Sequence, residues 1–130
     1  SDEGFDLVVG FSWGGGVACW LLDEGGWSGR TLLLAPTVFA MASASRQALP
    51  QFEVPRCHRR GVGNGGEAGL YAFCASADPF CPSGQVPYLR QRGAEVRVVR
   101  DAHVLDGAHT WEQIKRSFEE LLEISGTDML

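Results

Sequence analysis

Hydrophobic residues gather in four short runs along the chain, and each run is followed by a segment with helical spacing. The runs are rich in β-branched and large aliphatic side chains, and they end at glycine, proline or polar residues, which is typical of buried strands. The predicted strands cover residues 5–10, 31–35, 70–75 and 95–99. Because apolar runs without strict alternation indicate strands covered on both faces, we predict a parallel sheet.

Four helices are predicted after these strands. Apolar residues recur at helical spacing after Ser12, where Trp13, Val17 and Leu21 share one face. The other helices are predicted over 41–49, from Pro82 and Ser83 to Arg92, and from Thr110 to Gly126; Thr110 and Gln113 have the spacing of a capping box. The alternating order predicts an α/β fold in which helices flank a parallel sheet of about four strands.

Residues 51–69 interrupt this pattern, since they are rich in glycine and show no periodicity. We predict a mobile surface loop or insertion there. Its basic cluster, Arg56 to Arg60, could touch an anionic group, but a solvated loop is the favoured interpretation. Cys57 and His58 lack a second pair of ligands at zinc spacing, so no metal site is predicted.

Bulk properties restrict the function classes. With 130 residues, 45% of them apolar and 21% charged, the chain is expected to fold as one globular domain over 1–130. The net charge of −5 argues against nucleic acid as a partner, and no apolar run is long enough to span a membrane. The chain has no basic leader, and because it does not start with Met we expect its N-terminus to be a cut end, so that the missing leader says little about compartment. A fragment of a longer product is the favoured interpretation, and a true short chain of low stability and little activity is the alternative.

Four cysteines occur, at positions 19, 57, 74 and 81, and none forms a C-x-x-C pair. Cys19 and Cys74 fall in apolar patterns where buried free thiols are common. A reducing compartment, with the cytoplasm as the default localisation, is therefore the expectation. A Cys57–Cys81 bridge stays open as an alternative.

The segment Gly10-Phe11-Ser12-Trp13-Gly14 is a G-x-S-x-G motif placed where a predicted strand meets a predicted helix. A serine at such a turn has a strained backbone, and its hydroxyl is raised above the sheet. The first helical N–H groups, that of Trp13 in particular, lie ready for an oxyanion. The alternative is a glycine-rich turn with an incidental serine.

A nucleophilic serine needs a base, and the base needs an orienting acid. Asp78 follows the third predicted strand, and His103 follows the fourth. Both would lie at the carboxyl edge of the sheet beside Ser12. Asp78 could instead be a turn residue before Pro79, and His109 competes with His103 for the role of base.

These segments resemble the second half of the α/β-hydrolase fold. Residues 7–15 resemble the nucleophile elbow of that family, 73–82 its acid turn, with Ala75 where glycine is usual, and 96–103 its last strand and histidine loop. The resemblance implies Ser12 as nucleophile, Asp78 as acid and His103 as base. It also implies that the second oxyanion donor comes from a first half that these residues do not include.

The sequence therefore predicts a serine hydrolase that cleaves small-molecule carboxylic esters or thioesters without a cofactor. An open site suited to small or flexible acyl groups is expected, and acyl transfer to an alcohol is a variant of the same chemistry. The alternative is a noncatalytic α/β interaction domain with a hydrolase-like fold. The sequence leaves the oligomeric state open.

Overall fold

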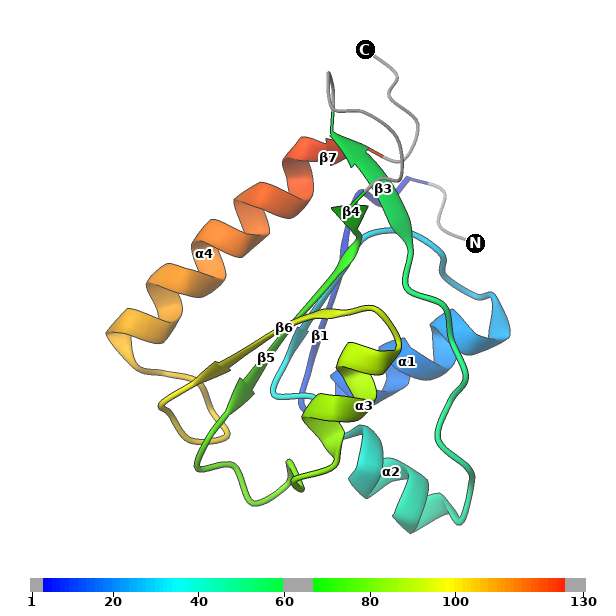
Figure 1. Ribbon diagram of the computed structural model, residues 1–130, viewed down its shortest axis with the longest axis vertical. Helices are drawn as coiled ribbons and strands as arrows, with labels where there is room; N and C mark the ends of the chain where they lie inside the picture. Colours follow the sequence, from blue (N-terminus) through cyan, green and yellow to red (C-terminus); the bar gives the residue numbers. More distant parts are fainter. Residues whose placement is uncertain (1–3, 60–66, 126–130) are drawn as a thin grey trace.

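The hydrophobic runs form the central sheet, as predicted. The computed structural model describes residues 4–59 and 67–125. Strands β1 (Val8–Phe11), β2 (Thr31–Leu34), β5 (Leu70–Ala75) and β6 (Glu95–Val99) are all parallel and lie in the order β1-β2-β5-β6 (Figure 1). The predicted four-stranded parallel sheet is confirmed.

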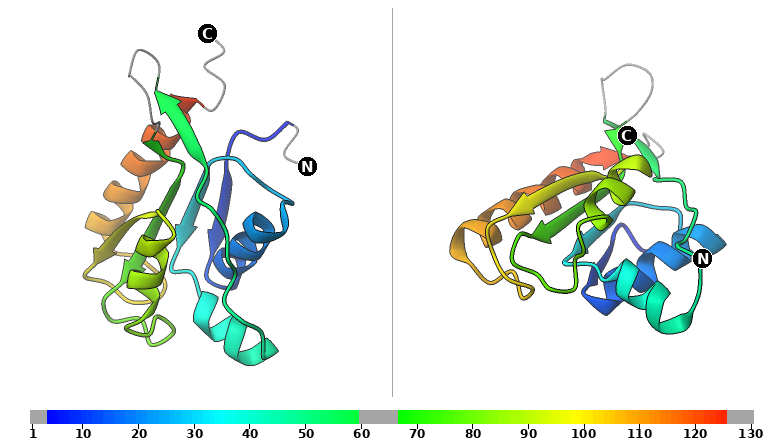
Figure 2. Two further views of the ribbon diagram at one scale, coloured as in Figure 1. Left: turned by 45° about the vertical axis from the view of Figure 1, so that its right-hand side comes forward. Right: turned by 60° about the horizontal axis from the view of Figure 1, so that its bottom comes forward.

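In the described parts of the chain, four helices cover the two faces of this sheet: α1 (Trp13–Glu24), α2 (Val38–Ser45), α3 (Gln85–Gln91) and α4 (Ala108–Glu123). Of these four, α4 lies on one face, whereas α1, α2 and α3 lie on the other (Figures 1 and 2). Helices on both faces explain why β5 is buried at every position. None of the described helices is both long and apolar enough to cross a bilayer.

Each face of the sheet has its own core. Alternate residues of β5 point to opposite faces, so Leu70, Ala72 and Cys74 pack towards α1 and α3. Tyr71, Phe73 and Ala75 pack towards α4 instead, together with residues such as Ile114 and Leu121. The central strands thus join two hydrophobic clusters through one backbone.

The prediction of a surface loop over 51–69 is wrong for its first part. Phe52 and Val54 are buried in the core between the sheet and α3, with Phe52 only 1% exposed. Strand β3 (Arg56–Arg59) follows and pairs antiparallel with β4 (Glu67–Ala68) and β7 (Ile124–Ser125). The glycine-rich positions 60–66 lie outside the described residues.

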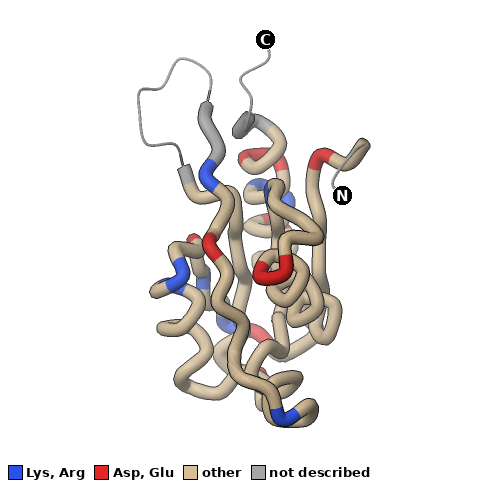
Figure 3. Tube along the Cα trace, turned by 90° about the vertical axis from the view of Figure 1, so that its right-hand side faces the viewer, with Lys and Arg blue, Asp and Glu red and all other residues tan. Residues whose placement is uncertain are grey.

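Figure 3 shows how the charged residues of the described ranges are distributed in one view. Acidic and basic positions are interspersed along the trace there. Arg56, from the predicted basic cluster, lies at the start of β3. Arg60 lies outside the described residues, as does Gly126, which was expected to close the last helix.

Several predicted helix boundaries shift. The second helix covers Val38–Ser45 rather than 41–49, so it begins soon after Pro36. The third begins at Gln85, which places Pro87 in the first turn, where its missing N–H has no intrahelical acceptor to lose. Gly93, which directly follows the predicted end of this helix at Arg92, has a φ of +98°, a conformation that favours glycine.

The predicted capping box is wrong, because α4 begins at Ala108, two residues before Thr110. The Thr110 hydroxyl donates to Asp101 Oδ2 at 2.8 Å instead of capping its own helix. The threonine hydroxyl is therefore bound by a carboxylate of the preceding loop.

Truncating Phe52 should destabilise the protein strongly. Phe52→Ala removes a fully buried ring and leaves a cavity, so we expect a loss of about 3–5 kcal/mol of unfolding free energy. Phe5→Ala is the matched control, since Phe5 is 69% exposed and its loss should change stability by no more than about 0.5 kcal/mol. Urea unfolding followed by circular dichroism measures both; equal effects would contradict the core assignment.

Candidate active site

Ser12 occupies a sharp turn between β1 and α1. Its backbone has φ 57° and ψ −118°, a region that L residues rarely adopt and that costs about 1–3 kcal/mol. Hydrogen bonds hold it there: its N–H donates to the Leu34 carbonyl at 2.8 Å, and its carbonyl accepts from the Thr37 N–H at 3.2 Å. The turn is therefore fixed by the strand beside it.

Two glycines allow this turn to form. A Cβ at Gly10 would come within 2.5 Å of the Gly14 carbonyl oxygen, and a Cβ at Gly15 within 2.8 Å of Pro36. At Gly14 itself a Cβ would meet nothing within 4 Å. Close packing of the backbone therefore requires glycine at Gly10, the first glycine of the motif, and at Gly15, which follows the motif.

Asp78 lies in the turn after β5, and its side chain is fully buried, with 0% exposure. The turn is closed by the Asp78 N–H to the Ala75 carbonyl, 3.2 Å, and by the Cys81 N–H to the Asp78 carbonyl, 3.1 Å. Carboxylate oxygen Oδ1 accepts the Phe80 N–H at 2.8 Å. Asp78 is thus a turn residue, which was the alternative interpretation of the sequence. Its second carboxylate oxygen, Oδ2, takes no part in the turn and accepts a hydrogen bond from another loop.

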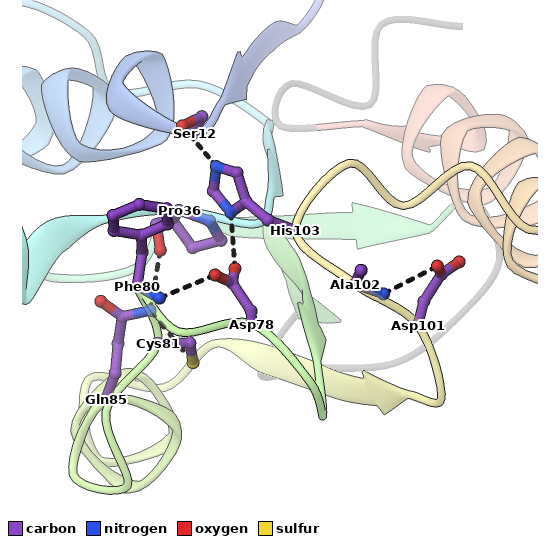
Figure 4. Close-up of polar contacts among 9 residues, drawn as sticks. All are labelled: Ser12, Pro36, Asp78, Phe80, Cys81, Gln85, Asp101, Ala102 and His103. Carbon is purple, nitrogen blue, oxygen red and sulfur yellow. Dashed lines mark hydrogen bonds and ion pairs between the residues drawn. The ribbon is translucent and has the colours of Figure 1, made fainter.

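The donor in that loop is His103. Its Nδ1 lies 2.7 Å from Asp78 Oδ2, and its Nε2 lies 2.8 Å from Ser12 Oγ (Figure 4). Because an ionised carboxylate only accepts, Nδ1 carries the proton and Nε2 is left to accept the serine hydroxyl. Three residues from three separate loops therefore form one continuous chain of hydrogen bonds.

Two aromatic rings flank the imidazole. Phe80 meets the His103 ring edge-on with 5.1 Å between centroids, and Phe11 lies tilted at 5.9 Å. Phe80 also reaches Asp78 through its backbone N–H. The rings restrict the orientation of the imidazole, a contribution that no spacing in the sequence indicated.

Asp101 orders the loop that carries His103. Its carboxylate accepts the N–H groups of Ala102 and Gly107, at 2.8 and 3.0 Å, in addition to the Thr110 hydroxyl. These three donors, Thr110 foremost, lower the pKa of Asp101 below its ordinary value. Asp101 thereby links both sides of the His103 loop to the first turn of α4.

Gln85 is a second residue whose part could not be read from the sequence. It is fully buried at the start of α3; its Nε2 donates to the Pro36 carbonyl at 2.8 Å, and its Oε1 accepts the Phe39 N–H at 3.2 Å. It thereby ties α3 to the segment between β2 and α2 (Figure 4). A buried glutamine carries no periodic signal, so only the packed structure reveals it.

Two apolar hollows lie on either side of α2. One, of about 370 Å³, is lined by Phe39, Ala40, Ser43, Pro79, Phe80 and Pro82. The other, of about 310 Å³, is lined by Trp13, Trp20, Met41, Ala44, Ser45 and Gln47. Both hollows lie close to the Ser12–His103 pair. Phe80 of the first hollow contacts the His103 ring, and Trp13 of the second directly follows Ser12 in the chain.

The remaining candidates lie elsewhere. His109 is exposed in the first turn of α4, and the structure joins Ser12 to His103 rather than to it. The His58 backbone lies in β3, which belongs to the small antiparallel sheet. Within residues 4–59 and 67–125, no three His, Cys, Asp or Glu side chains gather as metal ligands would.

Comparison with known proteins gives one informative result. No family model and no curated protein matches the chain. Among solved structures, the "Putative hydrolase" from Agrobacterium vitis S4 superposes with a TM-score of 0.58 at 17% identity. The two proteins share an α/β fold. The match covers 90% of this chain but only 61% of that one, so the chain spans less than two thirds of the neighbour's length.

Removing the Asp101 carboxylate should loosen the His103 loop. Asp101→Ala deletes three accepted hydrogen bonds, and we expect a lower Tm, whereas Asp106→Ala, an exposed charge in the same loop, should leave Tm nearly unchanged.

The Asp101 effect should depend on pH. Since the folded-state pKa is lowered, the stabilisation is present above the ordinary carboxyl pKa and is lost as the pH falls through the lowered value. Thermal melts of wild type and Asp101→Ala at pH 7 and in acid should therefore converge on acidification. A Tm difference that grows in acid would contradict this assignment.

Proposed function

We propose that the protein is a serine hydrolase of the carboxylesterase or thioesterase type, with Ser12 as nucleophile, His103 as base and Asp78 as orienting acid. The single observation that carries this proposal is the hydrogen-bond chain from Ser12 Oγ through both ring nitrogens of His103 to Asp78 Oδ2, at 2.8 and 2.7 Å. The strained backbone of Ser12 adds support, because strain at a non-glycine residue gathers at functional sites.

In this mechanism His103 Nε2 takes the proton as Ser12 Oγ attacks the carbonyl carbon of the substrate. Asp78 holds the imidazole tautomer and stabilises the imidazolium that forms. The tetrahedral intermediate collapses, and the protonated imidazole gives its proton to the leaving alcohol or thiol. A water molecule, deprotonated by the same histidine, then releases the acid from Ser12.

The oxyanion would be bound by the backbone N–H of Trp13. Trp13 is the first residue of α1, and the first N–H groups of a helix have no intrahelical acceptor. Their partial positive charge favours a developing anion at this position.

A second oxyanion donor is proposed to come from a segment outside these 130 residues. The incomplete cover of the longer Agrobacterium vitis structure is consistent with such a segment. Loss of one donor costs roughly 10²–10³-fold in rate, so the 130 residues alone are expected to react with activated acyl compounds but to turn over slowly.

The substrate is proposed to carry an apolar acyl group. Both hollows beside α2 are lined by apolar and small polar side chains, and neither has a charged residue in its lining. The hollow that contains Phe80 is the better acyl site, because the same ring contacts His103. We therefore propose an uncharged ester or thioester with its chain between α2 and the Asp78 turn.

A fluorophosphonate probe tests the nucleophile directly. The wild-type chain should be labelled at Ser12, Ser12→Ala should show no labelling, and intact-mass spectrometry measures both. His103→Gln should slow labelling by roughly 10²–10⁴-fold, since the base is lost. His109→Gln is the matched control and should label at the wild-type rate.

Three outcomes would contradict the proposal. Labelling that persists in Ser12→Ala would assign the reaction to another residue, and equal slowing in both histidine variants would deny His103 its special role. A folded wild-type chain that is not labelled at all would favour a noncatalytic interaction domain. Product analysis with an added alcohol separates hydrolysis from acyl transfer.

The acyl site is tested with alkyl fluorophosphonates of increasing chain length. Each methylene that enters the Phe80 hollow should speed labelling by up to about fourfold, the equivalent of burying one CH₂. Ala40→Trp should abolish this gain, because Ala40 lines that hollow. Ala44→Trp, one helical turn further along α2, narrows only the other hollow and should preserve it. The opposite pattern would move the acyl chain to the Trp13 side.

A further inference from the structure

The loop that carries His103 contains a leucine in a backbone conformation that leucine rarely adopts. Leu105 has a φ of +56°, in the left-handed region, where a bulky L side chain is an outlier. Among the described residues, the other non-glycine positions with a positive φ are Ser12, Ala35 and Arg46. Arg46 ends α2, and helices commonly end in a left-handed residue. Leu105 ends no helix, so its conformation has to be stabilised by its surroundings.

The Leu105 side chain is buried although the loop around it is not. Leu105 is only 4% exposed and belongs to the hydrophobic cluster that faces α4, together with residues such as Tyr71 and Ile114. Its neighbour Val104 is 59% exposed, and no other residue of 100–107 is buried. The left-handed backbone is therefore found at the one position where this loop inserts a side chain into the core.

The same residue closes the turn at whose centre His103 lies. The Leu105 N–H donates to the Ala102 carbonyl at 3.0 Å, which makes His103 and Val104 the two central residues of a β-turn. At the other end of the turn, the Ala102 N–H donates to Asp101 Oδ1 at 2.8 Å. His103 thus lies between a residue held by a carboxylate and a residue held by the core.

The hydrogen bonds to Asp101 and the burial of Leu105 act on different parts of the loop. Asp101 binds the two ends of the loop, through the N–H groups of Ala102 and Gly107. Between these ends, Leu105 is the buried residue, and it follows His103 by two positions. Because neighbouring residues of a chain cannot move independently, a fixed side chain at Leu105 restricts the backbone from which the imidazole extends.

The imidazole has little freedom to move before its contacts are lost. Its nitrogens lie 2.7 Å from Asp78 Oδ2 and 2.8 Å from Ser12 Oγ. Such hydrogen bonds extend to about 3.2 Å, so a displacement of the ring by roughly 0.5 Å weakens both of them. The position of the His103 backbone therefore has to be defined to within this distance.

We propose that Leu105 is a positioning residue for His103: its side chain, buried in the cluster that faces α4, fixes the turn that presents the imidazole to Ser12 and Asp78. This inference rests on the proposed function, in which His103 is the base. Leu105 acts through the backbone of the turn and not on the substrate. Its strained conformation adds support, since backbone strain that the surrounding structure maintains gathers at functional sites.

Fluorophosphonate labelling of Ser12 measures how well the base is placed. Leu105→Ala removes most of the buried side chain and should slow labelling by about 10–10²-fold, the effect of misplacing a catalytic group by about 1 Å. Leu105→Met nearly conserves the buried volume and should restore the rate to within about threefold of wild type. Leu105→Gly adopts the left-handed backbone without strain but has no side chain to bury, so it should slow labelling as Leu105→Ala does.

Leu121→Ala is the matched control for stability. Leu121 is also a leucine of this cluster and is 0% exposed, but it lies near the end of α4 and not in the His103 loop. Its truncation should lower the Tm at least as much as Leu105→Ala does, because both leave a cavity. The labelling rate of the folded Leu121→Ala chain should nevertheless stay within about twofold of wild type. Circular dichroism melts give the temperature below which each variant is folded.

A double-mutant cycle provides a measurement that a purely structural role would not change. In the His103→Gln background the base is already absent, so addition of Leu105→Ala should slow labelling further by less than about twofold. If Leu105 influenced Ser12 by another route, the effects of the two substitutions would multiply.

NMR spectroscopy of the chain labelled with ¹⁵N-histidine observes the imidazole without any reaction. In the wild type, the His103 Nδ1 proton that is donated to the buried Asp78 should exchange slowly with solvent, because such protons are protected until the structure opens locally. Leu105→Ala should speed this exchange, whereas Leu121→Ala should leave it slow below the melting temperature.

Three results would overturn the proposal: wild-type labelling rates in Leu105→Ala and Leu105→Gly, equal slowing in Leu121→Ala, or multiplying effects with His103→Gln. Failure of the proposed function is distinguishable, because the wild-type chain would then not be labelled or His103→Gln would have no effect. In that case the exchange of the Nδ1 proton decides: faster exchange in Leu105→Ala alone supports positioning of the ring by Leu105, and unchanged exchange contradicts it.

Discussion

The hydrogen bond between the buried Asp78 carboxylate and the His103 imidazole is the constraint on which the site depends. A carboxylate with no solvent exposure needs donors, since an unpaired buried charge is expensive. Asp78 obtains one donor from its own turn, at Phe80, and the other from a loop 25 residues away. The burial of this acid therefore requires the two loops to meet, and their meeting orients the ring towards Ser12.

The parallel sheet makes this meeting geometrically possible. Because the strands are parallel, β1, β5 and β6 have their carboxyl ends on the same side of the sheet, and the residues that follow them lie on that side. Yet Ser12 follows one edge strand and His103 the other, because the strand order is β1-β2-β5-β6. The loop that carries His103 therefore extends from the end of β6 over the ends of β5 and β2 towards Ser12. Asp101 stabilises this conformation of the loop by accepting hydrogen bonds from the loop and from the start of α4.

The strands and the three aligned side chains were within reach of sequence reasoning, whereas their supports were not. Hydrophobic runs locate strands because burial acts on neighbouring residues, and chain order places Ser12, Asp78 and His103 at one edge. Asp101, Gln85 and Phe80 act through contacts between distant segments, which leave no periodicity. The same limit explains Phe52: its core position depends on α3, while its neighbours in sequence are those of a loop. The capping rule failed at Thr110 because α4 begins two residues earlier, and the threonine hydroxyl donates to Asp101 instead.

Ser12, the proposed nucleophile, follows a strand at the edge of the described sheet, and this restricts where further parts of the proposed site can lie. On the α4 side of β1, Val9 and Phe11 are 47% and 45% exposed, and Trp111, Phe118 and Leu122 of α4 are also exposed. Apolar surface beside an open strand edge is unusual for a finished sheet, which covers or charges its edges. A donor that completes the proposed oxyanion site has to approach Ser12 from beyond this edge, because β2 occupies the other side of β1. The proposed second donor and the exposed apolar surface would therefore lie on the same side of β1, beyond the last strand of the described sheet.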